Sequence, residues 1–461
     1  MKEEIKPDVN IDNSSSISDE QKRFLEFYNS LSPEEQKRYD KDSSKTYAKR
    51  LNELKKASNP KKFLIRKILL ISGILTSVIV FSLLTFLVII PNVAYKKGMS
   101  SYENGDYEKA LNYFKTAKTL KKGQKYFNLT KAEIALKNGN KKEAALYYGS
   151  VAEDEYFQKS KELFWNDHLS QEPIAYLSEK GVYAGITNDG KIKLSDADKI
   201  AADTFYKFHD WNNLCEVKAH YDSIVGLKQD GTVIVTGNNN YAKGVSKWTN
   251  IVSVYIDFKL LIGLRADGTL EVLGNKDVKN KLSKIKNVIN FDITSVEYHA
   301  NYDITTEYEM VLVTSDGNVK HLATKDFSKD LAEELAEVNN AITISIYNQN
   351  GYGTSVVVLY EDGTTKCFGN TSDGKADANN WTNIKEAHIF NGIVCGITND
   401  GNFVAAGKLS DENVALMQNP VHILDINEIA IIDKDGKVIL TKYSEIAIKD
   451  WDNILISKSN K

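Results

Sequence analysis

The stretch 225–251 reads VGLKQDGTVIVTGNNNYAKGVSKWTNI, and its pattern decides the fold of most of the chain. Two apolar runs flank Asp230-Gly231, and a tight hairpin turn needs the positive φ that glycine supplies. Trp248-Thr-Asn-Ile then leads into another apolar run. We therefore expect two antiparallel strands, a polar loop, and a new strand after the tryptophan.

The same pattern recurs along the second half of the chain. Asp-Gly occurs seven times between apolar runs, with glycines at Gly190, Gly231, Gly268, Gly317, Gly363, Gly401 and Gly436. The closing signature has Trp211, Trp248, Trp381 and Trp451 at one position, a weaker copy at Ile285, and degenerate copies at Val338-Asn-Asn and Gln418-Asn-Pro-Val. Because four of the five tryptophans share one phase of the repeat, we expect buried packing residues rather than ligand-stacking platforms, Trp248 and Trp381 included.

This period resembles the regulator-of-chromosome-condensation repeat in its bacterial form. The resemblance covers about 174–461, and seven copies imply a seven-bladed β-propeller over 173–461. The strand that closes the ring is expected from ILISK (454–458), with Ile174–Ser178 as the alternative. The eukaryotic prototype of this family exchanges nucleotide on a small GTPase. Only the shared scaffold matches here, so that activity is not carried over.

A second decisive stretch lies upstream, at Ile68–Ile90. It holds 23 residues without a charge or a proline, which is long enough for a helix to cross a bilayer core of about 30 Å. Eight Lys and Arg stand in the 20 residues before it and three in the 20 after it. The side richer in basic residues stays cytoplasmic, so we expect an uncleaved single-pass anchor with residues 92–461 outside the cell membrane.

The flanking segments have their own signatures. Residues 1–67 are expected to be a cytoplasmic tail, disordered over 1–17, with capping boxes at Ser18–Gln21 and Ser32–Glu35. A helical domain is expected over 92–170, and within it residues 92–152 resemble two tetratricopeptide repeats: Gly98, Ala110 and Phe114 recur 34 positions later as Ala132, Ala144 and Tyr148. Residues 153–169 are expected to form a capping helix.

Composition and motifs exclude several functions. The outer part carries a net charge of −7, which argues against a nucleic-acid partner. The odd set Cys215, Cys367 and Cys395 argues against a disulfide framework, and the apolar runs around Cys215 and Cys395 favour buried thiols there. No catalytic, cofactor-binding or metal-binding residue is identified, and ligand-binding residues stay unknown. The acidic loop Asn370–Asp377 is the best, weak candidate for a metal. A composition rich in Lys, Asn and Ile and poor in Pro is typical of a low-GC bacterium.

Three functional hypotheses follow. The first is a membrane-anchored platform that binds a protein or glycan outside the membrane, held by the bilayer through residues 68–90 and without a cofactor. The second is an extracytoplasmic enzyme with its site in the propeller mouth, which requires clustered titratable groups with shifted pKa values in the central channel. The third is a transmembrane sensor that signals through a cytoplasmic partner of residues 1–60.

Overall fold

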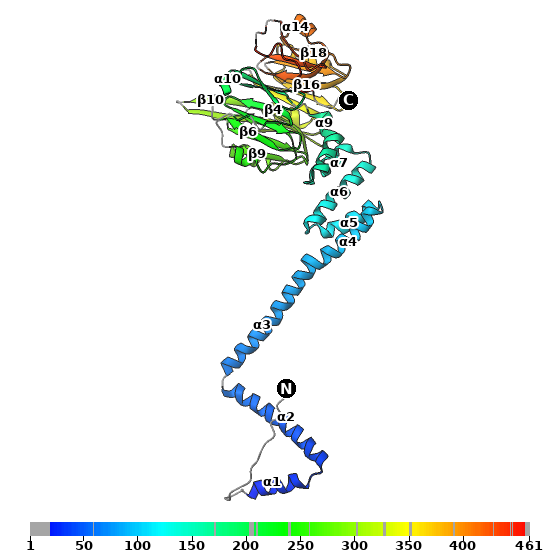
Figure 1. Ribbon diagram of the computed structural model, residues 1–461, viewed down its shortest axis with the longest axis vertical. Coiled ribbons are helices and arrows are strands. Elements are labelled where there is room, and N and C mark those ends of the chain that lie inside the picture. The colour runs from blue at the N-terminus through cyan, green and yellow to red at the C-terminus, as the bar shows by residue number, and fades with distance from the viewer. Residues whose placement is uncertain are drawn as a thin grey trace. The chain divides into compact units, whose positions relative to one another are not determined.

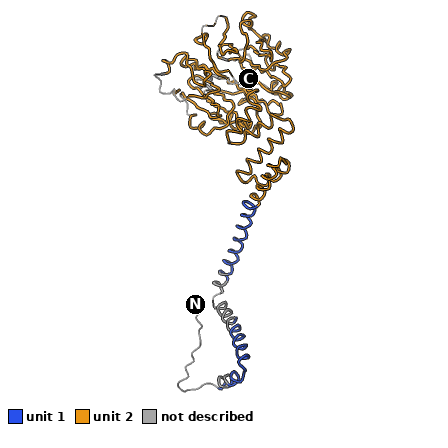
Figure 2. Tube along the Cα trace, turned by 45° about the vertical axis from the view of Figure 1, so that its right-hand side comes forward, with its two compact units in different colours: residues 1–89 blue, residues 90–461 orange. Residues whose placement is uncertain are grey.

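The computed structural model describes residues 19–58, 60–169, 172–201, 207–208, 211–237, 241–257, 259–300, 303–325, 329–349, 353–390, 392–426, 428–442, 444 and 446–456. The chain forms two compact units, Met1–Ile89 and Ile90–Lys461 (Figure 2). The disorder expected for residues 1–17, and Ser18 of the first capping box, lie outside the described residues.

The first unit is helical. Its elements are α1 (Asp19–Ser30), α2 (Pro33–Ser58), α3 (Pro60–Leu84) and the π-helical turn η1 (Thr85–Ile89). The second capping box is confirmed, because the Glu35 carboxylate accepts hydrogen bonds from the backbone N–H of Ser32 at 2.9 Å and from its hydroxyl at 2.7 Å. Pro33 takes the first helical position, where a missing N–H costs no hydrogen bond.

The apolar stretch Ile68–Ile90 is helical throughout. Among the described residues, the helix Lys67–Glu103 is the only one that is long and apolar enough to cross a membrane, judged by length and composition alone. Its large side chains are exposed, for example Leu70 at 67% and Phe86 at 68%. Apolar side chains exposed over such a length need an apolar environment or partner.

The second unit begins with helices that pack in sequence (Figure 1). They are α4 (Ile90–Glu103), α5 (Tyr107–Ala117), α6 (Lys121–Lys137), α7 (Lys141–Gly149), α8 (Asp154–Ser160), the π-helical turn η2 (Lys161–Trp165) and α9 (Asn166–His168). Small residues allow this close packing: Ala110 and Ala144 are fully buried, and a Cβ on Gly98 would lie 2.6 Å from the Phe114 ring.

After the helices come antiparallel three-stranded sheets, each built from consecutive strands. Within the described residues the sheets are β1 (Ile174–Leu177), β2 (Val182–Ile186), β3 (Ile192–Leu194); β4 (Leu214–His220), β5 (Ser223–Lys228), β6 (Val233–Gly237); β7 (Ile251–Asp257), β8 (Leu260–Arg265), β9 (Leu270–Gly274); β10 (Val288–Ala300), β11 (Asp303–Thr314), β12 (Val319–Ala323); β13 (Ala341–Gln349), β14 (Gly353–Tyr360), β15 (Thr365–Gly369); β16 (Ile384–Phe390), β17 (Ile393–Thr398), β18 (Phe403–Ala406); β19 (Pro420–Asp425), β20 (Ile429–Asp433) and β21 (Val438–Leu440).

Short helices follow the third strand of most sheets, namely α10 (Asp198–Ala201), α11 (Ala242–Val245), α12 (Lys276–Leu282), α13 (Lys329–Ala336), the 3-10 helix η3 (Lys375–Asn380) and α14 (Asp411–Leu416). The first strands of successive sheets contact one another, as β4 does with β1 and β7, and buried apolar clusters fill the space between neighbouring sheets. This arrangement is a propeller-like β domain.

Two backbone positions with positive φ define each repeat. The glycine of each Asp-Gly hairpin turn between two strands of a repeat has a φ between 75° and 80°. The asparagine of every closing signature is also left-handed, a conformation that asparagine tolerates better than most side chains. These asparagines are Asn213, Asn250, Asn287, Asn340, Asn383, Asn419 and Asn453. Asn419 shows that the sixth copy aligns on Met417 rather than Gln418 in the tryptophan position.

These two positions join each sheet to the next. The backbone N–H of Ile251, which begins β7, donates to the carbonyl of Gly231 in the preceding sheet at 3.0 Å. The same bond joins Ile454 to Gly436 at 3.0 Å. In the sixth copy the donor position holds Pro420, which has no N–H.

The tryptophans pack as expected in part. Trp211, Trp248 and Trp451 are buried, whereas Trp381 is only partly buried, which corrects the expectation for that residue. Tyr241, which follows the polar Gly-Asn-Asn-Asn stretch that starts at the last residue of β6, is half-buried against the cluster that holds Trp248. The three cysteines are buried thiols, as was expected for Cys215 and Cys395.

The first sheet is completed by both ends of the β domain. Strand β1 pairs with β2 from Ile174 opposite Gly185 to Leu177 opposite Val182. Beyond β1, Ile454 forms an antiparallel bridge with Thr187, and the N–H of Leu455 donates to the carbonyl of Ile186 at 2.8 Å. Both segments that the sequence suggested therefore pair along the same edge of β2, at successive places on that edge.

The helices of the second unit dock directly onto the sheets. The side-chain amide of Asn250 donates to the carbonyls of Gly149 and Val151, both at 3.0 Å. A Cβ on Gly149 would lie 2.3 Å from the carbonyl oxygen of Ala266, so only glycine permits this approach. The chain then runs through α9 to Glu172 and enters β1.

Candidate functional site

A cavity of about 370 Å³ lies where the first strands of the sheets meet the end of the helical segment. Its walls come from β4, β7, β10, β13, β16 and β19. Residues Asn166–Leu169, at the end of the helical segment, also line it, and Glu172 joins them on the way to β1. The cavity is thus shared by the helices and the sheets.

The repeat explains why polar side chains face this cavity. Side chains alternate along a strand, so the third and fifth residues after each left-handed asparagine lie on one side. The third positions hold Glu216, Ser253, Asn290, Thr343, Glu386 and His422, and the fifth hold Lys218, Tyr255, Asp292, Ser345, His388 and Leu424. Most of these residues line the cavity. Different chemistry at equivalent positions has produced a ring of charged and polar groups.

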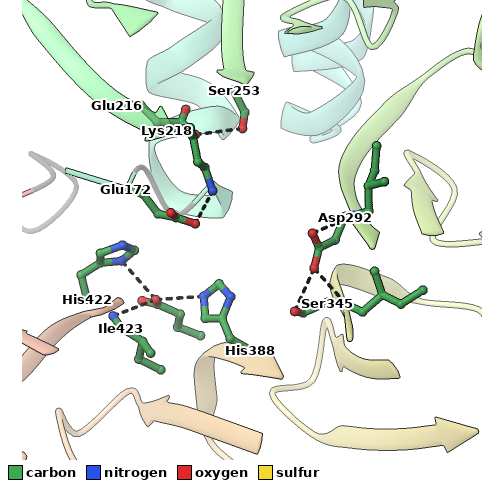
Figure 3. A network of polar contacts seen from close by, with 12 residues as sticks. Glu172, Glu216, Lys218, Ser253, Asp292, Ser345, His388, His422 and Ile423 are labelled. Carbon is green, nitrogen blue, oxygen red and sulfur yellow. Dashed lines mark hydrogen bonds and ion pairs between the residues drawn. The ribbon is translucent and has the colours of Figure 1, made fainter. Parts of the chain in front are cut away.

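The first cluster in this ring is centred on Lys218 (Figure 3). Its ammonium forms an ion pair with Glu172, and Lys218 and Glu216 come from the same strand. Burial opposes the charge of Lys218, but the carboxylate of Glu172 outweighs it and raises the pKa of the lysine. Burial also raises the pKa of Glu216 to about 8, so its carboxyl is largely protonated at neutral pH.

The second cluster joins two histidines to one carboxylate (Figure 3). Oxygen Oε1 of Glu386 accepts from Nε2 of His388 and from Nδ1 of His422, both at 3.1 Å, and from the backbone N–H of Ile423 at 3.2 Å. Burial alone would raise the pKa of Glu386, but its histidine partners outweigh burial and lower it. Burial works against protonation of His388, and the bond to Glu386 raises its pKa.

Asp292 forms a third polar centre, on β10. One of its oxygens accepts from the Ser345 hydroxyl at 3.0 Å and from the Ile346 N–H at 2.9 Å, and the other accepts from the Ile293 N–H at 2.8 Å. Burial still raises the pKa of this carboxyl. These bonds reach from β10 to β13 and fix the orientation of Asp292 in the cavity wall.

Two buried polar atoms of the described residues have no hydrogen-bond partner at this site. They are Nε2 of His422 and Oε2 of Glu216. Buried polar groups are paired in most proteins, so each such atom calls for an explanation. His422 donates through Nδ1 to Glu386, so Nε2 is the ring nitrogen that is left without a partner. A ligand or water in the cavity would satisfy it.

The arrangement is suited to binding a polar molecule. Several of its charged groups are paired within the chain, because Lys218 faces Glu172 and Glu386 contacts His388 and His422. Ser253, Asn290 and Thr343 add neutral groups that both donate and accept hydrogen bonds. Within the described part of the chain, no group of three or more His, Cys, Asp or Glu side chains is placed to hold a metal ion.

Sequence reasoning did not identify this site. The tryptophans singled out from the sequence lie outside the cavity lining, and Asp373 of the acidic loop pairs with Lys408 at 2.9 Å. No motif marks this site in the sequence. Its residues could have been found only by their place in the repeat, since they are the polar residues three and five places after each signature asparagine. The enzyme hypothesis required clustered titratable groups with shifted pKa values, and the cavity lining holds such groups in Asp292, Glu386 and His388.

Comparisons with known proteins give weak likenesses. No protein-family model matches the chain, and no curated protein sequence matches it. Among solved structures, the WD40 β-propeller domain of Doa1 is 12% identical, covering 60% of this chain and 96% of that one, with a TM-score of 0.31. BamB from Moraxella catarrhalis is 11% identical, with 59% and 84% covered and a TM-score of 0.30.

Prp20p from Saccharomyces cerevisiae, whose structure was described with its binding to Gsp1p and histones, is 10% identical. The match covers 60% of this chain and 68% of the Prp20p chain, with a TM-score of 0.27. At such TM-scores neither fold nor function is inferred from these likenesses. The propeller-like architecture follows from the strand pairing and the contacts between sheets described above.

Proposed function

We propose that this protein is a single-pass membrane protein that displays a ligand-binding platform outside the cell membrane. Residues 68–90 are its anchor, and residues 1–67 are its cytoplasmic tail. Residues 92–170 form tetratricopeptide-like hairpins, and residues 173–461 form a seven-bladed propeller. The platform binds a glycan or a protein through the cavity shared by its helices and sheets.

One observation carries the binding proposal. A cavity of about 370 Å³ is lined by oriented polar groups from several sheets, and the buried Nε2 of His422 has no partner among the described residues. This volume falls in the range of small-molecule sites. Lys218 and Glu386 are already paired within the chain, which disfavours a strongly ionic ligand at these groups, whereas many oriented donors and acceptors suit a molecule rich in hydroxyls. We therefore favour the end of a glycan over a protein side chain.

Thermal unfolding of the full chain in detergent micelles, with and without a panel of mono- and oligosaccharides, tests this assignment. A ligand that binds only the folded state raises the unfolding temperature. Lys385→Gln, in the cavity lining, and His422→Gln should reduce the shift, while the exposed Lys434→Gln should keep it. A shift that survives both cavity variants, or no shift with any saccharide, would contradict the proposed site.

A second candidate function is glycoside hydrolysis, favoured by one observation. Asp292 and Glu386 both line the cavity, burial raises the pKa of Asp292 while the histidines lower that of Glu386, and two carboxyls whose pKa values are shifted apart can serve as acid and base. Chromogenic glycosides incubated with the full chain would reveal turnover. Asp292→Asn should abolish it, and the exposed Asp330→Asn should not. Absence of turnover by the native chain would leave binding as the function.

The orientation in the membrane has its own test. Protease added to intact protoplasts should degrade residues 92–461 and leave a fragment near residues 1–90. The physical reason is the excess of basic residues before the apolar stretch. Protection of the β domain would reverse the orientation and make cytoplasmic partners the leading idea.

A further inference from the structure

The segment 109–142 is strongly basic, although the outer part of the chain is acidic as a whole. It holds ten lysines and a single acidic residue, Glu133. Four of these lysines, Lys115, Lys118, Lys121 and Lys122, surround the turn from α5 to α6 and are exposed. Among the described residues, none of the four forms an ion pair. Their charge is therefore available to a partner outside the chain.

The helix packing determines which part of α4 lies beside the α5–α6 turn. Helices α4 and α5 run antiparallel, since Tyr102 contacts Tyr107 near the loop and Gly98 faces Phe114 farther along. The end of α5 therefore returns to the beginning of α4. Lys122 confirms this level, because its Nζ lies 4.5 Å from the centre of the Tyr95 ring.

The beginning of α4 is also the end of the apolar stretch. Tyr95 follows Ile90 by five residues in the same helix, a rise of about 7.5 Å at 1.5 Å per residue. The headgroup layer outside the hydrocarbon core is about 5–8 Å thick on each side. If Ile90 ends the membrane span, Tyr95 and Lys122 stand at headgroup level, where tyrosines are enriched.

We propose that the α5–α6 turn, with Lys118, Lys121 and Lys122, docks on the anionic phospholipid headgroups of the membrane that holds the anchor. This inference rests on the proposed anchor at residues 68–90 and is independent of the cavity. Lys96 and Lys97 of α4, also exposed, extend the basic surface, and the half-buried Leu120 adds an apolar group at its tip. Docking would limit the tilting of the second unit on its anchor.

A fluorescent label tests the contact in the full chain. Thr119→Cys places a single exposed thiol in the turn, because the three native cysteines are buried, and NBD attached there reports on its surroundings. The chain is reconstituted in nanodiscs of phosphatidylcholine, with or without phosphatidylglycerol, that contain a headgroup spin-label quencher. Asn138→Cys, at the other end of α6, carries the same label as the matched control.

We expect quenching at position 119 in discs with phosphatidylglycerol, reduced in neutral discs and at high salt, and little quenching at 138. The triple variant Lys118→Gln, Lys121→Gln and Lys122→Gln should lose it. The equivalent change at Lys279, Lys284 and Lys286 on the β domain should not. Equal quenching at 119 and 138 in chains that enter the discs overturns the docking but not the anchor. Failure to enter the discs overturns both.

Discussion

Trp248 lies against Gly263 so closely that its Cζ3 is 2.9 Å from the position a Cβ would take on that glycine. The tryptophan precedes the first strand of its sheet, and the glycine lies on the middle strand. The same pair recurs as Trp211 with Gly226 at 2.9 Å and Trp381 with Gly396 at 3.0 Å. The glycines thus make room for the indole rings of the repeat.

Truncation of Trp248 should destabilise the β domain. Trp248 is 4% exposed, and removal of a buried large aromatic usually costs about 3–5 kcal/mol. We expect Trp248→Ala to lower the thermal unfolding temperature of the full chain in micelles more than Trp381→Ala, whose ring is only partly buried. Equal unfolding temperatures for Trp248→Ala and the native chain would show that this tryptophan is not a packing residue.

The tryptophan–glycine pair should behave as a coupled unit. Gly263→Ala places a methyl group where the indole lies, and overpacking of this kind costs about 1–3 kcal/mol. In the Trp248→Ala background the indole contacts of this methyl group are gone and its remaining close neighbour is Cδ1 of Ile251 at 3.1 Å, so most of the added cost should disappear. A double-mutant cycle measured by denaturant unfolding gives the coupling. Additive effects would mean that the ring and the glycine do not restrict each other.

The side chain of Asn250 should stabilise the folded protein in addition to its left-handed backbone conformation. Asn250→Gly keeps the left-handed φ but removes the side chain that binds Gly149 and Val151, so two buried carbonyls lose a donor. We expect a cost of about 1–3 kcal/mol. Asn287→Gly is the matched control, since Asn287 has the same φ of 57° and an exposed side chain. Similar stabilities of the two variants would contradict a docking role for Asn250.

Closure of the first sheet should depend on the C-terminal segment. Ile454 is fully buried and bridges Thr187, so Ile454→Ala loses core packing beside the strand that joins the two ends of the β domain. A cost of about 2–5 kcal/mol is expected. Ile456→Ala, at a partly buried position two residues later, should cost less. Hydrogen exchange of β2 amides, measured by mass spectrometry, should increase in Ile454→Ala first.

The stability of the fold should depend on the protonation of Glu216. Its pKa is about 8 in the folded state against about 4.3 when unfolded, so the folded state holds the proton more tightly. The contribution of this group to stability is therefore fullest below about pH 4.3 and falls as the pH rises to about 8. Glu216→Gln should unfold at a higher temperature than the native chain at pH 8, with a smaller difference at pH 4. The exposed Glu333→Gln should show no such trend.

Much of the local structure could be predicted from the sequence because it depends on neighbours in the chain. The Asp-Gly hairpins, the capping box at Ser32 and the helical apolar stretch all follow from residue types at short spacings. The left-handed conformation of the signature asparagines is also a local property, although it was recognised only from their φ angles. The exposure of Trp381 could not be predicted, because it depends on how neighbouring sheets pack around equivalent positions.

The sequence by itself determined the period, the hairpins and the apolar stretch, since each needs only a short-range preference of φ or of solvation. Only the tertiary structure decided that Ile454 and Ile174 complete one strand position, and that Glu386 meets His422 while Lys218 meets Glu172. These residues stand on different sheets or at opposite ends of the β domain. Their meeting depends on the rotation from one sheet to the next, which no local pattern records. The cavity exists for the same reason, because its lining is one short segment from each of many repeats.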